Sequence, residues 1–399
     1  MRVGTPGFVP ERLAEIRAAR RILSMTELAR MLGVNPAAVS RWENGIHAPD
    51  ADALSVLARE LRVRREYFLR PVHVSDHPMF SRSYANALKR DTSYQGSQMQ
   101  WLQEISSTLQ HYVDFPEVDI PNVMKGLTYK QLRDEDIEGI AQDLRAHWNL
   151  GQGPCLNVLE VLERIGIVVG SIEMGTSKLD GLCSWSQGEE RPHILLASDK
   201  MSLPRRQMDA AHELGHAVLH KGVTEAELKA DLKEIERQAF RFASAFLMPA
   251  TTYVYEVKHY SLAGLLSLKE KWRVSVKAQI RRLKDLDVIP DHHATQLHKS
   301  YSARGWQKEE PMDREWPIPE PSLLRDALNL IVDSGTRTKA QLLAEEFTMR
   351  PADIENLSGL PSGWFNKGEA SVVQLTLKAG PQKNADQSIP GEIIPFSKR

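Results

Sequence analysis

The sequence predicts a multidomain protein with an all-α N-terminal domain, an α+β domain in the middle and a mainly helical C-terminal region. Three observations support this fold class. The 399 residues exceed the roughly 100–200 residues of one ordinary domain. Apolar residues recur at helical spacing over residues 8–70. Between 125 and 300, amphipathic stretches alternate with short β-branched or apolar runs, which is typical of a small α+β domain.

Changes of pattern along the chain predict the domain boundaries. Residues 101–113 form an apolar helical pattern that FPEVDIP (115–121) ends, because its prolines cannot continue a helix. We expect five segments. They are an N-terminal domain at 8–70, a helical connector at 71–124, the α+β domain at 125–300, a helical accessory region at 301–378 and a polar, mobile tail at 379–399.

Within the later segments, apolar spacing predicts the individual elements. Segment 158–174 is expected to run from a helix into a strand at its β-branched residues. The other expected helices lie at 134–151, 209–220, 235–249, 322–334 and 338–348, with a helix pair at 265–289 and strands at 179–185 and 193–198. Segment 364–377 is one more strand candidate.

Composition excludes several classes of protein. Cys155 and Cys183 are the only cysteines, so the chain has neither a disulfide framework nor a cysteine-based zinc cluster, and both are expected to be buried thiols. Any metal must therefore bind to histidines and carboxylates. The N-terminus MRVGTPGFVP does not have the pattern of a signal peptide, and no apolar run approaches the ~20 residues of a membrane span. We expect a cytoplasmic protein without a membrane partner.

The segment SMTELARMLGVNPAAVSRWENGIHAP (24–49) predicts a helix–turn–helix. Ser24 can cap its first helix and Gly33 supplies the turn. Asn35 can cap the second helix, where Pro36 takes the first helical position. Residues 1–70 also carry 12 arginines, no lysine and 8 acidic residues, a net charge of +4 in a chain whose formal net charge is −1.

The second helix of this motif has the outward face of a DNA-recognition helix, which lies in the major groove of double-stranded DNA. The outward residues are Ala37, Ala38, Ser40, Arg41 and Asn44. The segment 8–70 resembles the lambda-repressor-like, XRE-type DNA-binding domain, although Met25 stands where that family commonly has glutamine. A helical protein-interaction module with the same fold is the alternative.

The stretch DAAHELGHAVLH (209–220) places His212 and His216 four residues apart, on one face of a helix. Both imidazoles can bind one Zn²⁺ ion, and Glu213 can then act as the general base of a metallopeptidase. Two surface histidines on an ordinary helix are the alternative. A third ligand is available in Glu236, which begins the inward face of the next predicted helix.

These segments together resemble the ImmA/IrrE family of metallopeptidases, fused to an N-terminal XRE-type domain, over about residues 8–312. The resemblance is carried by LDGLCSW (179–185), HILLAS (193–198), AAHELGHAVLH (210–220) and ERQAFRFASAFLMP (236–249). It implies a zincin-like metallopeptidase fold with His212, His216 and Glu236 as zinc ligands and Glu213 as general acid and base. It also implies that Arg205 or Arg206 belongs to the connection from strand to helix before the motif.

One departure from the family concerns the third ligand. Many relatives carry an acidic residue where Gln238 stands, and activity would be lost if that later position were the ligand. We prefer Glu236, because it shares a helical face with Ala239 and Ala243. Glu234 and Asp231 are weaker substitutes.

Six other residues are expected to be structural rather than functional. They are His193, His220, Trp185, Trp272, Tyr253 and Tyr255. His220 lies two turns after His212 and could approach the site, and His193 could line the cleft from the end of a strand. Nothing in the sequence directs either tyrosine toward an oxyanion.

The sequence therefore favours a transcription regulator with a zinc-dependent endopeptidase domain that cleaves a regulatory protein, such as a repressor. The alternatives are a regulator with a non-catalytic, sensory peptidase-like domain and an antitoxin-like binding protein. The expected partners are double-stranded DNA and a protein substrate. A homodimer is an option, and it would require half-sites about one helical turn apart.

Overall fold

The computed structural model describes residues 4–73, 78–80, 89–174, 180–186, 190–199 and 202–366. The expected fold class is confirmed: a helical N-terminal region is followed by an α+β region with a small sheet and then by further helices. The described residues up to Phe365 belong to one compact unit. The expected tail and most of the strand candidate at 364–377 lie outside the described residues, and the five domain boundaries stay predictions.

The N-terminal region contains the helix–turn–helix expected from its caps. Its helices are α1 (Pro10–Ala19), α2 (Met25–Leu32), α3 (Pro36–Glu43) and α4 (Ala51–Leu61), followed by the 3-10 turn η1 (Arg65–Leu69). Ser24 accepts a hydrogen bond from the backbone N–H of Glu27, and Asn35 accepts one from that of Ala37. Gly33 ends α2 at φ +67°, in the left-handed region that favours glycine.

Helix α5 (Lys89–Gln110) is longer at its start than the expected 101–113 and ends before residue 111. Its fully buried residues Trp101, Leu102, Ile105 and Leu109 form the face that the apolar spacing predicts. The indole N–H of Trp101 donates to the hydroxyl of Tyr67 in η1, at 3.2 Å. Helix α5 thus contacts both the N-terminal helices and strand β3 of the sheet.

The sheet has three strands in the order β1-β3-β2: β1 (Val168–Ile172), β2 (Gly181–Trp185) and β3 (Pro192–Ala197). Strand β3 pairs in parallel with β1 and antiparallel with β2. Every residue of the three strands is buried, which explains their continuous apolar sequences. Alternate residues face two different cores: Ile194 packs on the side of α8, and Leu195 on the side of α5.

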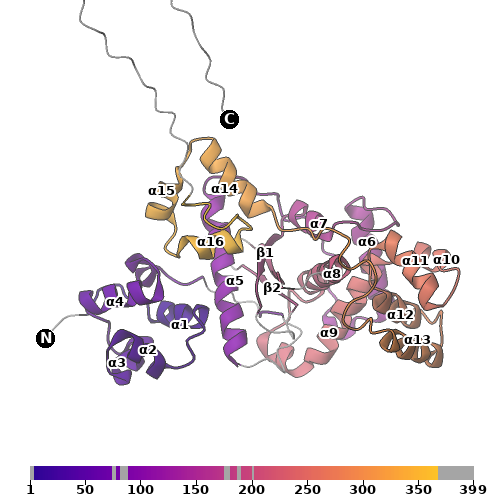
Figure 1. The fold of residues 1–399 in the computed structure, drawn as a ribbon, viewed down its shortest axis with the longest axis horizontal. Coiled ribbons are helices and arrows are strands. Elements are labelled where there is room, and N and C mark those ends of the chain that lie inside the picture. The colour runs from indigo at the N-terminus through magenta and orange to yellow at the C-terminus, as the bar shows by residue number, and fades with distance from the viewer. Residues whose placement is uncertain are drawn as a thin grey trace, which may run out of the picture. The chain divides into compact units, whose positions relative to one another are not determined.

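Two helices before the sheet and two long helices after it make up the core that positions the site. They are α6 (Asp134–His147), α7 (Val158–Arg164), α8 (Leu203–Leu219) and α9 (Glu225–Leu247). Helix α8 lies against both β2 and α9 (Figure 1). Helix α9 starts ten residues before the expected 235, because Thr224 and Glu227 form a capping box there, and it kinks at Asp231.

The remaining helices are α10 (Ala250–Glu256), α11 (Leu262–Trp272), α12 (Val276–Asp285), α13 (Asp291–Ala303), α14 (Leu323–Asp333), α15 (Lys339–Gln341), the π-helical turn η3 (Leu342–Glu346) and α16 (Pro351–Leu357). The expected helix pair at 265–289 corresponds to α11 and α12, whereas α10, α13 and α16 were not expected. Helices α14 and α16 contact β1 and α5, so the C-terminal helices share a core with one face of the sheet. No helix among the described residues could span a membrane.

Helices α8 and α9 approach each other closely at Gly215. A Cβ atom added to Gly215 would lie 3.1 Å from the carbonyl oxygen of Ala239 and 3.1 Å from a ring carbon of Phe242. A methyl group therefore fits there only if the backbone of Ala239 and the ring of Phe242 shift by a few tenths of an ångström. Gly139 of α6 offers a contrast, because nothing lies within 4 Å of an added Cβ atom.

We expect Gly215→Ala to lower the free energy of unfolding by about 1–3 kcal/mol through overpacking. We expect the matched variant Gly139→Ala to raise it by about 0.5–1 kcal/mol, because alanine is the better residue inside a helix. Urea unfolding followed by tryptophan fluorescence measures both. Equal effects of the two variants would contradict the close approach at Gly215.

Candidate functional site

Three side chains on α8 and α9 converge at the centre of the α+β region. The Nε2 atoms of His212 and His216 lie 3.1 Å apart. Each of these nitrogens lies 3.3 Å from one carboxylate oxygen of Glu236. The structure therefore brings together the three residues that the sequence indicated as ligands. Glu234 and Asp231 point to other partners, Arg237 and Tyr129 respectively.

The donor set and its spacing fit a zinc ion. Ligands placed about 2.0–2.1 Å from a tetrahedral Zn²⁺ are about 3.3 Å from one another, which is close to the observed separations. Both carboxylate oxygens of Glu236 are buried and make no hydrogen bond to a described residue. Burial alone would raise the pKa of Glu236, but His212 and His216 hold it below its ordinary value. An ionised carboxylate beside two imidazoles is a set of ligands that zinc prefers.

The other ring nitrogen of His216, Nδ1, begins a series of buried hydrogen bonds. Its Nδ1 atom lies 3.0 Å from Nδ1 of His220, whose Nε2 atom lies 3.1 Å from the amide oxygen of Gln238. The amide nitrogen of Gln238 donates to the backbone oxygen of Tyr129 and to Glu234. If His216 donates from Nδ1 and His220 donates from Nε2, each hydrogen bond in this series has one donor and one acceptor. The Nε2 atom of His216 is then free to bind a metal.

Gln238 therefore does not face the ligand cluster. Its side chain orients His220, and His220 in turn orients His216. Gln238, the residue that departs from the family pattern, therefore helps to position a candidate ligand. Burial, with the neighbouring His216, keeps the pKa of His220 well below its usual value, so His220 is neutral and can accept the hydrogen bond. Sequence reasoning recognised only the missing acid at this position, because these partners are far apart in the chain.

Glu213 lies beneath the first residue of β2. A Cβ atom on Gly181 would lie 2.6 Å from Oε1 of Glu213, so a larger residue there would require the Glu213 side chain to shift. Its other oxygen, Oε2, is buried without a hydrogen-bond partner among the described residues. Burial raises the pKa of Glu213 well above its usual value, and the charges of Glu236, Asp209 and Asp180 add to the effect. A cation held by the ligand cluster would counteract it.

Of the remaining candidate residues, most are buried in the fold. Tyr253 is buried against Trp272 and donates to Gln279, whereas Tyr255 is 78% exposed. His193 is buried with its pKa lowered to about 3 by desolvation.

Arg205 forms an ion pair with Asp180, next to Gly181, and Arg206 is buried. The thiols of Cys155 and Cys183 are buried as expected.

One residue close to the ligands carried no signal in the sequence. The ring of Phe80 is stacked on that of His216, with centroids 4.9 Å apart and an interplanar angle of 13°. Phe80 is fully buried, although it belongs to a segment that the sequence predicts only as a connector.

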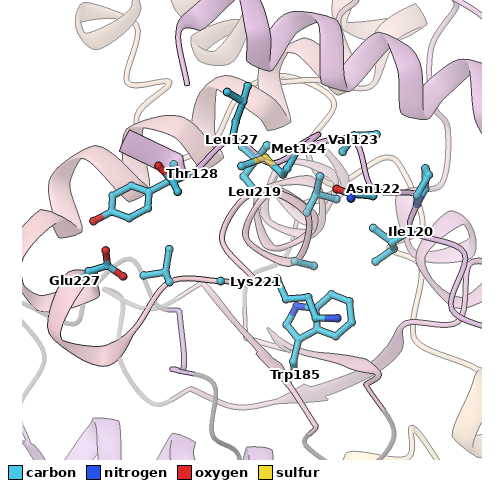
Figure 2. Close-up of a pocket in the computed structure, with 16 residues that line it drawn as sticks. Ile120, Asn122, Val123, Met124, Leu127, Thr128, Trp185, Leu219, Lys221 and Glu227 are labelled. Carbon is cyan, nitrogen blue, oxygen red and sulfur yellow. The ribbon is translucent and has the colours of Figure 1, made fainter. Parts of the chain in front are cut away.

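A pocket of about 550 Å³ opens beside the C-terminal end of α8 (Figure 2). Its wall includes Trp185 at the end of β2, and the ammonium group of Lys221 lies 4.0 Å from the centroid of the indole ring. The three ligand residues do not line it.

The five residues expected to contact DNA differ in their exposure on α3 and at its C-terminal end. Ala37, Arg41 and Asn44 are exposed, whereas Ala38 and Ser40 are half-buried. Val39 and Trp42 are buried beneath them. The side-chain amide of Asn44 donates to the backbone oxygen of Ser40 at 2.7 Å. The guanidinium group of Arg41 is thus the exposed positive charge on this face.

Comparison with known families agrees with this architecture. Residues 162–284 match the IrrE N-terminal-like domain, a zinc metallopeptidase-like family, and residues 13–68 match a helix-turn-helix family. The predicted fusion of an XRE-type DNA-binding domain with an ImmA/IrrE-type peptidase domain is thereby confirmed. A comparison with curated protein sequences finds no match.

We expect His220→Ala to weaken zinc binding by about 10–100-fold, because the second hydrogen bond of a metal-binding histidine fixes its orientation. Competition with a chromophoric chelator measures the affinity. His193→Ala, which also removes a buried imidazole, is the matched control and should bind zinc as the parent does. Equal affinities of the parent and His220→Ala would contradict the orienting role.

Proposed function

We propose that the chain is a DNA-binding transcription regulator whose peptidase domain is a zinc-dependent endopeptidase that cleaves a regulatory protein, such as a repressor. The observation that carries this proposal is the convergence of His212, His216 and Glu236 at zinc-ligand spacing, with the carboxyl group of Glu213 buried one residue after His212. The presence of a DNA-binding domain in the same chain favours a regulatory substrate over general digestion.

The side chains present can divide the work of peptide hydrolysis. A zinc ion held by His212, His216 and Glu236 would polarise the scissile carbonyl and make a water molecule more acidic. Glu213 would accept the proton of the attacking water at Oε2, which has no other partner among the described residues. It would then donate this proton to the nitrogen of the leaving amine.

Glu213→Gln tests the catalytic part of this proposal. We expect the variant to keep its zinc and its DNA binding, because Glu213 is not among the converging ligands, and to cleave its substrate at least about 100-fold more slowly. Sequencing of new protein N-termini in cells that express either form would identify the substrate and measure its cleavage. His212→Ala is the comparison variant that should lose zinc as well. An unchanged set of cleaved proteins in Glu213→Gln would contradict the peptidase mechanism and favour a sensory domain.

Arg41→Ala tests the DNA-binding part. If Arg41 contacts a base, we expect the variant to bind specific DNA more weakly by about 1–3 kcal/mol. If Arg41 contacts a phosphate, we expect the slope of the logarithm of the binding constant against the logarithm of the salt concentration to fall by about one. The matched control is Arg59→Ala, which removes an equal charge from an exposed position on α4. Titration of the protein with fragments of its own promoter region at several salt concentrations gives both quantities. Equal behaviour of the two variants would contradict recognition by α3.

A further inference from the structure

The outer edge of β2 carries a short stretch of the chain's own connector. Strand β2 pairs with β3 along one edge. On the other edge, the backbone N–H of Phe80 donates to the oxygen of Cys183 at 3.0 Å, and the N–H of Cys183 donates to the oxygen of Phe80 at 3.3 Å. The two residues form an isolated antiparallel bridge. This is the pairing that a bound extended peptide makes with a sheet edge.

The bridge places Phe80 on the face of the sheet that holds the ligand cluster. Side chains of directly paired residues project to the same face, and Cys183 packs in the core on the α8 side. Gly181, two residues earlier, shares that face and lies over Glu213. A peptide on this edge therefore passes Glu213 and the ring of His216, on which Phe80 is stacked.

The ring of Phe80 fills an apolar pocket next to the ligands. Its walls are Tyr129, Val223, Leu228 and Ile235, together with the rings of His216 and His220. Phe80 and His216 are both fully buried, and only 4% of the His212 side chain is exposed. A peptide substrate cannot approach His216 from this side while Phe80 remains in the pocket.

We propose that Phe80 is an internal competitor of the protein substrate. Its backbone occupies the peptide-binding edge of β2, and its ring occupies a pocket for an aromatic side chain beside His216. A protein substrate must displace Phe80 and place a bulky apolar side chain in the same pocket. The inference rests on the proposed peptidase function.

The test uses the full chain with Glu213→Gln, which prevents cleavage, and a fluorescent peptide VSDHPMFSRSY, the sequence of residues 74–84. Fluorescence anisotropy measures peptide binding with and without the additional change Phe80→Ala. We expect Phe80→Ala to bind the peptide about tenfold more tightly, since a site that its own chain fills nine-tenths of the time binds a competitor tenfold more weakly. A peptide with alanine in place of phenylalanine should bind weakly to both forms.

Hydrogen exchange of the Cys183 amide gives a second measurement. We expect it to be slow in the Glu213→Gln parent, faster in Phe80→Ala and slow again when the peptide is added. Val257→Ala, which truncates a buried valine outside this pocket, is the matched control and should exchange as the parent does. Phe80→Leu, which keeps the pocket filled, should give a smaller increase in peptide affinity and remains informative if Phe80→Ala does not fold.

Equal peptide affinities in the parent and both Phe80 variants, or unchanged exchange at Cys183, would overturn the inference. The outcome is separate from that of the proposed function, because binding is measured without cleavage. Failure of the peptide to bind contradicts only the proposed role of Phe80. The absence of any cleaved protein contradicts the peptidase proposal.

Discussion

The close packing of α8 against α9 is the constraint on which the site depends. Gly215 lets the backbone of Ala239 approach α8, and this approach brings Glu236 to the two histidines on the neighbouring turns of α8. Helical spacing alone would place His212 and His216 on one face, but it would leave them without a carboxylate. The same packing directs Gln238 to His220, so one helix contact sets both the proposed ligands and the hydrogen bonds that orient them.

A second core links the DNA-binding helices to the back of the sheet. Helix α5 packs on α1, on β3 and on the C-terminal helices α14 and α16. Buried charges reinforce the link: Arg12 of α1 forms an ion pair with Glu104 of α5, and Arg20 forms one with Asp353 of α16. Arg12 also pairs with Glu15, and Asp353 also pairs with Arg350, so each contact between helices belongs to a small cluster of charges.

Local signals in the sequence were sufficient to predict part of this architecture. Caps such as Ser24 and Asn35 act within a few residues, so the helix–turn–helix could be placed accurately, and the four-residue spacing of His212 and His216 required only a helix. Other features depend on contacts between distant segments. The hydrogen bond of Gln238 to Tyr129, the stacking of Phe80 on His216 and the packing of α14 and α16 on the sheet join residues whose pairing no local pattern encodes.

X-ray absorption at the zinc edge of the purified full chain tests the central claim, that α8 and α9 hold one zinc ion through two histidines and a carboxylate. The account predicts a first shell of nitrogen and oxygen at about 2.0–2.1 Å, with the outer-shell scattering of two imidazole rings and no sulfur. Loss of the carboxylate contribution and of tight binding in Glu236→Ala, but not in Glu234→Ala, would assign the third ligand. Absence of zinc from a folded chain supplied with it, or a shell without imidazole, would contradict the account.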